Sequence, residues 1–105
     1  MKELTAKDLK DWMSAGKQFQ LLDIREPWEL EVASIGGVHI PMNDILKRSN
    51  EVDTNLPCVI YCRIGRRSAN VVKALEFHRN FNNLYNLKGG LESWAKEVDP
   101  SMEIY

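Results

Sequence analysis

The segment from Tyr61 to Ser68 reads Tyr-Cys-Arg-Ile-Gly-Arg-Arg-Ser and places a thiol where it can react. Cys62 ends an apolar run typical of a strand, and a short loop with one glycine and three arginines follows before a helical pattern begins. Helix-terminal N–H groups and guanidinium charges both stabilise a thiolate, which is the reactive form of cysteine. The segment therefore predicts a nucleophilic cysteine facing an anionic substrate.

The loop residues after the cysteine have distinct expected roles. Gly65 permits a tight turn in which successive N–H groups point inward and form a nest for an anion. Arg63 adjoins the sulfur and Arg67 begins the helix, so these two are favoured as substrate contacts, whereas one arginine of the three is expected in solvent. The predicted substrate-binding set is Arg63, Ile64, Gly65, Arg66, Arg67 and Ser68.

The second cysteine, Cys58, lies in the same apolar run, between Pro57 and Val59, and is expected in the core. Two cysteines four positions apart in one strand are too far from each other for a comfortable disulfide. Reduced thiols in a cytoplasmic protein are the simpler interpretation.

Helical and strand patterns alternate along the chain. Strands are expected over 19–24, 38–40, 58–61 and 83–87, and helices over 5–16, 27–32, 43–46, 68–79 and 91–98. Strands separated by helices pair in parallel through right-handed crossovers, with both faces of the sheet covered. The pattern predicts a compact α/β fold with a parallel sheet flanked by helices on both faces.

In such a sheet, ligands bind beyond the carboxyl ends of the strands. Asp23 and Arg25 lie at the end of the strand expected over 19–24, so they should meet Cys62 at one edge of the sheet. Three roles remain open for them: pairing with each other, bracing the loop, or contacting the substrate.

Length and composition exclude several classes of protein. A chain of 105 residues indicates one domain spanning 1–105, and a net charge of −1 without a basic face argues against nucleic-acid binding. No apolar run approaches membrane length, and no His/Cys cluster indicates a metal, so neither a membrane, a metal nor a cofactor is expected.

Four segments together resemble the rhodanese-like (sulfurtransferase) domain family over essentially the whole chain. They are Asp23–Glu26, Gly37–Pro41, the loop after Cys62, and Asn86–Gly90 before a tryptophan. The resemblance implies that Cys62 takes sulfane sulfur from a small anionic donor such as thiosulfate and carries it as a persulfide. The acceptor would be cyanide, a thiol or a protein, and Asp23 and Arg25 would support the site.

One segment departs from the family pattern. Residues 33–38 read Ala-Ser-Ile-Gly-Gly-Val, where family members often read Gly-His-Ile-Pro-Gly-Ala. The departure bears on acceptor choice and leaves the cysteine loop unchanged.

Two other functions compete with sulfur transfer. A cysteine phosphatase or arsenate reductase also couples a strand-end thiolate to an arginine, but phosphatases place five residues between the two, and here four separate Cys62 from Arg67. A non-catalytic docking or redox-sensing module is the other alternative, and the intact cysteine and arginines argue against it.

Overall fold

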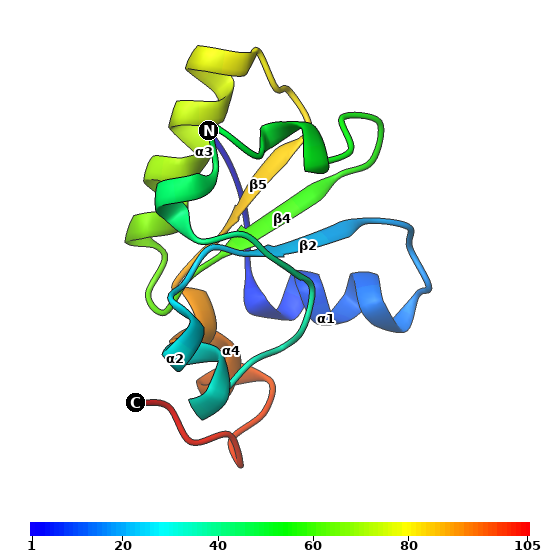
Figure 1. The fold of residues 1–105 in the computed structure, drawn as a ribbon. Helices are drawn as coiled ribbons and strands as arrows, with labels where there is room; N and C mark the ends of the chain where they lie inside the picture. Colours follow the sequence, from blue (N-terminus) through cyan, green and yellow to red (C-terminus); the bar gives the residue numbers. More distant parts are fainter.

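The computed structural model describes residues 1–105, and strands alternate with helices along the chain (Figure 1). The strands are β1 (Lys2–Leu4), β2 (Gln20–Asp23), β3 (Val38–His39), β4 (Cys58–Tyr61) and β5 (Leu84–Leu87). The helices are α1 (Ala6–Ser14), α2 (Pro27–Val32), α3 (Arg66–Arg79) and α4 (Gly90–Glu97), with two 3₁₀ helices, η1 (Met42–Asp44) and η2 (Ser49–Glu51).

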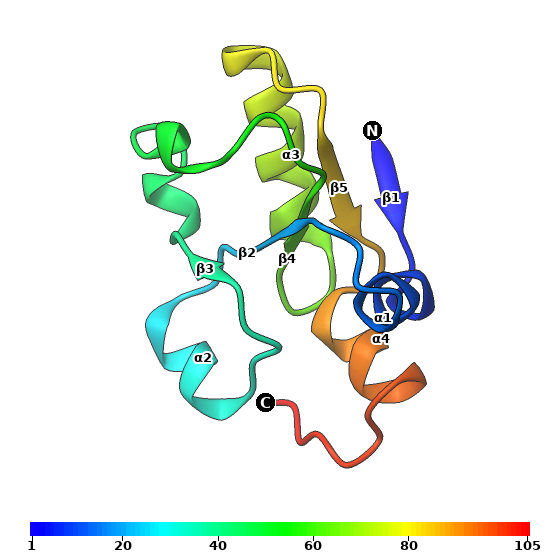
Figure 2. The same cartoon turned by 90° about the vertical axis from the view of Figure 1, so that its right-hand side faces the viewer.

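The five strands form one sheet in the order β1-β5-β4-β2-β3, and every neighbouring pair is parallel. Figure 2 shows β1 and β3 at opposite edges of this sheet. All four residues of β4 are buried, as expected for a central parallel strand covered on both sides. The predicted parallel α/β fold is confirmed.

Consecutive residues of β4 point into two different cores. Ile60 packs with Val72 and Leu75 of α3 in a core that also includes residues around η1. Val59 faces the other way and packs with Leu9 of α1 and Leu91 of α4. Helices therefore cover both faces of the sheet, and the carboxyl ends of the strands remain free to form the rim that carries the site.

Two elements differ from the prediction. The strand β1 was not predicted, because three residues at a sheet edge, two of them exposed, are too short to show a periodic pattern. The helix expected from Asn43 through Leu46 is instead the 3₁₀ helix η1 followed by turns, with Asn43 inside it. Asn and Asp compete for backbone hydrogen bonds and so favour turns over an α-helix.

The ends of the other elements are close to those expected. The capping box at the start of α1 is present: Thr5 and Asp8 exchange side chain-to-backbone hydrogen bonds. The helix α3 begins at Arg66, two residues earlier than predicted, which places it directly after the left-handed Gly65. None of the helices has the length and apolar character needed to cross a bilayer.

Candidate active site

Cys62 follows β4 directly, and two backbone N–H groups are directed at its sulfur. The N–H of Gly65 donates to Sγ at 3.1 Å and that of Ser68 points to Sγ at 3.4 Å. The loop can direct both N–H groups at the sulfur because Gly65 has a φ of +96°. Residues with a Cβ atom rarely adopt this conformation. Cys62 itself is fully buried. Two N–H groups directed at one sulfur favour its negatively charged form.

The hydroxyl of Ser68 and the amide of Asn86 complete the surroundings of the sulfur. Ser68 Oγ lies 3.3 Å from Cys62 Sγ and donates to Asn86 Oδ1 at 2.5 Å. Asn86 in turn donates from Nδ2 to the carbonyl oxygen of Gly65 at 3.1 Å. This one amide on β5 therefore connects the middle of the loop with its end, and its role was not anticipated from the sequence.

Arg67 is held by the carboxylate of Glu29, a residue that the sequence analysis did not predict to be part of the site. Its two terminal nitrogens contact the two oxygens of Glu29 on α2, each at 2.8 Å, and Glu29 is 3% exposed. The pairing raises the pKa of Arg67. Burial works against the charge of Glu29, but hydrogen bonds from Arg67, from Tyr105 and from the amide of Glu26 outweigh it and lower the pKa of Glu29 to about 2.

The other two arginines have different surroundings. The guanidinium of Arg63 stacks on the ring of Tyr105, 5.0 Å from its centroid. Its Nε is buried without a hydrogen-bond partner, since the nearest carboxylate oxygen, on Glu92, is 3.9 Å away. Arg66 is exposed and in no ion pair, and Ile64 is likewise exposed. The structure thus brings Arg63 and Arg67 into networks at the site and leaves Arg66 in solvent.

Asp23 and Arg25 form a buried ion pair beneath the rim. Arg25 donates to both carboxylate oxygens of Asp23, at 2.9 and 2.8 Å, and to the carbonyl oxygen of Ala33 at 2.8 Å. Burial disfavours the charge of Arg25, but the bonds to Asp23 and Tyr105 outweigh it and raise its pKa. Neither residue of the pair is hydrogen-bonded to Cys62 or to the loop after it, so of the three roles left open the geometry fits mutual pairing, and the further bonds of Arg25 brace Ala33 and Tyr105 instead of the loop.

Segment 33–38, which departs from the family pattern, is held by two backbone carbonyls and by one side chain, since Ser34 Oγ lies 3.3 Å from the hydroxyl of Tyr61. The carbonyl oxygen of Ala33 accepts from Arg25, and that of Gly36 accepts from the hydroxyl of Tyr61 at 2.9 Å. Contacts to carbonyl oxygens do not depend on side-chain identity. Two of the three contacts that hold the segment are therefore independent of its side chains.

Cys58 lies in the core, fully buried, and both cysteines are free thiols. Burial raises the pKa of Cys58 to about 12. At neutral pH Cys58 is an uncharged apolar group. Its sulfur has no amide donors around it, whereas that of Cys62 has two.

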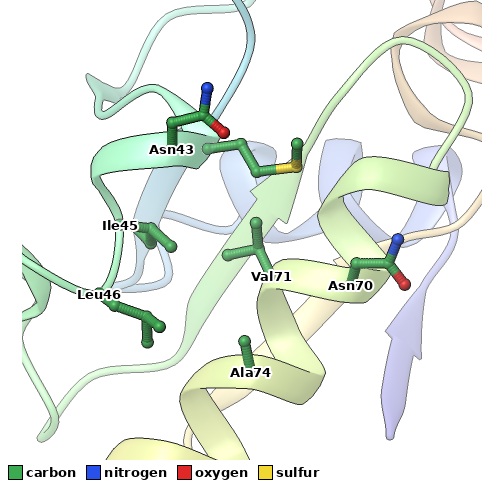
Figure 3. Close-up of a pocket in the computed structure, with 7 residues that line it drawn as sticks. Asn43, Ile45, Leu46, Asn70, Val71 and Ala74 are labelled. Carbon is green, nitrogen blue, oxygen red and sulfur yellow. The ribbon is translucent and has the colours of Figure 1, made fainter.

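A cavity of about 350 Å³ lies between η1 and α3 (Figure 3). Its walls are formed by Met42, Asn43, Ile45, Leu46, Asn70, Val71 and Ala74. No residue from Cys62 to Ser68 lines it. The sulfur site and this largely apolar hollow are therefore separate features of the molecule.

Comparison with known proteins places this arrangement in a family. The sequence profile described as "Rhodanese-like domain" matches residues 5–97. The chain is 35% identical to "Putative sulfurtransferase YtwF" of Bacillus subtilis, covering 95% of this chain and 96% of that protein. It is 32% identical to "Probable adenylyltransferase/sulfurtransferase MoeZ" of Mycobacterium tuberculosis, over 97% of this chain but only about a quarter (26%) of that relative's length.

Solved structures agree. A rhodanese-like domain protein from Staphylococcus aureus superposes with a TM-score of 0.82 at 32% identity, covering 100% of this chain and 99% of that one. A rhodanese-related protein from Thermoplasma volcanium gives the same TM-score at 28% identity, over 93% and 94% of the two chains. The sequence profile, the similar sequences and the similar solved structures agree with the cysteine loop at the edge of a parallel sheet. The chain belongs to the rhodanese-like domain family.

Proposed function

We propose that this protein is a sulfurtransferase that moves sulfane sulfur from a small anionic donor such as thiosulfate to a thiol or cyanide acceptor through a persulfide on Cys62. The observation that carries the proposal is the sulfur's surroundings. Amides of Gly65 and Ser68 are directed at Sγ, and the hydroxyl of Ser68 lies at 3.3 Å. Preorganised donors of this kind stabilise negative charge on the attacking thiolate and then on the persulfide it becomes.

The reaction proceeds in two half-reactions with a covalent intermediate. The thiolate of Cys62 attacks the outer sulfur of thiosulfate, the donor's S–S bond breaks, and sulfite leaves with the bonding electron pair. The new S–S bond is the Cys62 persulfide. Cyanide or a thiolate then attacks the outer sulfur of the persulfide, and the electron pair of that bond returns to Cys62 as thiolate. No external oxidant or reductant is needed when cyanide is the acceptor.

The donor's anionic oxygens need cations close to the sulfur. Arg63 is adjacent to Cys62 in sequence, its side chain is 43% exposed, and its guanidinium makes no hydrogen bond within the protein. Arg67 carries a positive charge near the same thiolate and is fixed in place by Glu29. We infer that Arg63 offers the free donor and Arg67 a fixed positive potential for the incoming anion.

Names of relatives also support sulfur transfer to or from a protein. MoeZ carries both an adenylyltransferase and a sulfurtransferase name, and a further relative, 31% identical, is named "Putative sulfur carrier protein YrkF". A protein thiol or carrier is therefore a proposed acceptor beside small thiols. We propose the cytoplasm as its location, where reducing conditions keep Cys62 available as a thiol.

The decisive experiment is intact-mass measurement after incubation of the purified protein with thiosulfate. A gain of one sulfur atom, lost again on addition of cyanide with formation of thiocyanate, is the expected result. A protein whose mass stays unchanged, and which releases no sulfite, would instead be the non-catalytic docking or redox-sensing module.

A further inference from the structure

We propose that Tyr105 is a positioning residue that holds Arg63 and Arg67 in place for the anionic sulfur donor. The inference rests on the proposed function and extends it to a residue outside the cysteine loop. The segment after α4 returns along the molecule and brings Tyr105 next to α2, as its red trace shows in Figure 2.

The ring of Tyr105 supports Arg63 from one face. The guanidinium carbon of Arg63 lies 5.0 Å from the ring centroid, within the range of a cation–π contact. Guanidinium N–H groups lie in the plane of the group, so stacking on a face leaves them free to bind an anion. The Arg63 side chain is 43% exposed and its guanidinium makes no hydrogen bond within the protein, so its solvent-facing N–H groups are such free donors. Stacking therefore restricts the side chain without using its donors.

The hydroxyl of Tyr105 acts on Arg67 through Glu29. It donates to Glu29 Oε1 at 2.6 Å, the same oxygen that accepts from Arg67 Nη2 at 2.8 Å. The hydroxyl also accepts from Arg25 Nη1 at 3.0 Å, which leaves its proton directed to Glu29. Through one carboxylate oxygen, Tyr105 thus fixes the geometry of the second arginine.

The position of Tyr105 is itself constrained. Trp28 on α2 packs edge-on against its ring, with centroids 5.2 Å apart. Four side chains therefore surround the tyrosine: Trp28 beside the ring, Arg63 on its face, and Glu29 and Arg25 at its hydroxyl. Tyr105 thus links the arginine next to the thiol, by cation–π stacking, with the carboxylate that holds Arg67, by a hydrogen bond.

The test compares Tyr105→Ala and Tyr105→Phe with the wild-type protein in steady-state sulfur transfer from thiosulfate to cyanide. We expect Tyr105→Ala to raise the KM for thiosulfate about fivefold, with kcat and the KM for cyanide nearly unchanged. Tyr105→Phe keeps the stacking ring but loses the hydroxyl that bonds to Glu29, so its KM for thiosulfate should lie between those of the wild type and Tyr105→Ala. Phe77→Ala is the matched control, since Phe77 is an aromatic residue 80% exposed on α3 and should leave every parameter unchanged.

A second readout does not depend on turnover. Sulfate resembles the sulfonate end of thiosulfate, so it should raise the Tm of the wild-type protein and of Phe77→Ala more than that of Tyr105→Ala. If sulfate discriminates the variants in this way but no sulfur is transferred, the proposed function fails and the role of Tyr105 stands. Equal KM values for thiosulfate in wild type and Tyr105→Ala, or an equal or absent sulfate effect, would overturn the role of Tyr105.

Discussion

The amide of Leu91 donates a 2.9 Å hydrogen bond to the carbonyl oxygen of Cys62, so the first turn of α4 is held against the residue that carries the thiol. The next amide, of Glu92, donates to the carbonyl oxygen of Arg63 at the same distance. Two N–H groups that a helix start would otherwise leave without partners thus anchor the loop. The rigidity of the sulfur site depends on a helix that contributes none of its side chains to the sulfur.

This contact predicts that Gly90→Ala will damage both stability and sulfur transfer. Gly90 has a φ of +60°, and an added Cβ would lie 2.5 Å from the carbonyl oxygens of Cys62 and Arg63. We expect a loss of roughly 3 kcal/mol in the free energy of unfolding. Gly16→Ala is the control: Gly16 also has a positive φ but nothing within 4 Å, so only the backbone strain of about 1 kcal/mol should appear. Urea unfolding of both variants is the measurement, and equal losses would contradict the steric account.

The roles of the two cysteines are distinguished by replacing each with alanine. Cys62→Ala should accept no sulfur from thiosulfate, because the persulfide has no other site with amide donors. Cys58→Ala should still gain one sulfur, at some cost in stability from the core cavity. Intact-mass measurement with peptide mapping tests the assignment of the persulfide to Cys62. A persulfide mapped to Cys58 in the native protein would contradict that assignment.

Ser68→Ala tests the hydroxyl beside the sulfur. The change removes the group 3.3 Å from Sγ and leaves Asn86 Oδ1 without its buried donor. We expect a loss of about 1–2 kcal/mol in stability and a several-fold lower kcat with thiosulfate. Ser14→Ala, at the exposed end of α1, is the matched control and should change neither. Unfolding and kinetics measured on the same preparations separate the two effects, and an unchanged kcat would remove Ser68 from the site.

Glu29→Gln tests the ion pair with Arg67 through pH. The pKa of Glu29 is about 2 in the folded protein against 4.5 ordinarily. A lowered pKa means that ionised Glu29 stabilises the fold above about pH 4.5 and that this stability disappears as pH falls through 2. Glu29→Gln should therefore cost about 3 kcal/mol at pH 7 and about half as much at pH 3. Denaturant unfolding at the two pH values is the check; a penalty independent of pH would show that the charge is not the cause.

The phosphatase alternative predicts a different substrate profile. Only four residues separate Cys62 from Arg67, and both terminal nitrogens of Arg67 are already bound to Glu29. Few donors remain to bind three equatorial oxygens of a phosphoryl group, whereas a single terminal sulfur needs fewer. The purified protein should release sulfite from thiosulfate in the presence of cyanide and show no turnover of p-nitrophenyl phosphate. Robust phosphatase activity lost in Cys62→Ser, with no sulfur transfer, would reverse the assignment.

Much of the fold follows from local patterns that the sequence displays. The run Cys58–Tyr61 is apolar throughout, and it is the central strand; Pro27 and the capping box at Thr5 mark helix starts where the structure has them. The loop after Cys62 could also be predicted, because a thiol, a glycine and three arginines lie close together in the sequence. The assignment of site roles to these loop residues stays a prediction until the variants are measured.

The partners of the loop could not be predicted, because they come from distant parts of the chain. The segment Asn86–Gly90 carries part of the family resemblance, but nothing in it indicates that Asn86 bonds to the loop, and Glu29 lies in a helix where acidic residues are common. Nothing local marks Tyr105, whose role arises from where the last segment crosses the surface. Such contacts depend on tertiary packing, which short-range periodicity does not encode.

The edge strand β1 also has a consequence for the order in which the sheet forms. Its register partner for Lys2 is Tyr85, 83 positions along the chain (from 2 to 85), whereas Gln20 of β2 pairs with Cys58 and Cys58 with Leu84. Closing so long a loop costs more chain entropy than either of the others. A chain emerging from the ribosome cannot make this pairing until β5 has been synthesised. The residues of β1 are therefore among the last to enter the sheet although they precede every other strand in the sequence, and we expect their amides to exchange with solvent before those of β4.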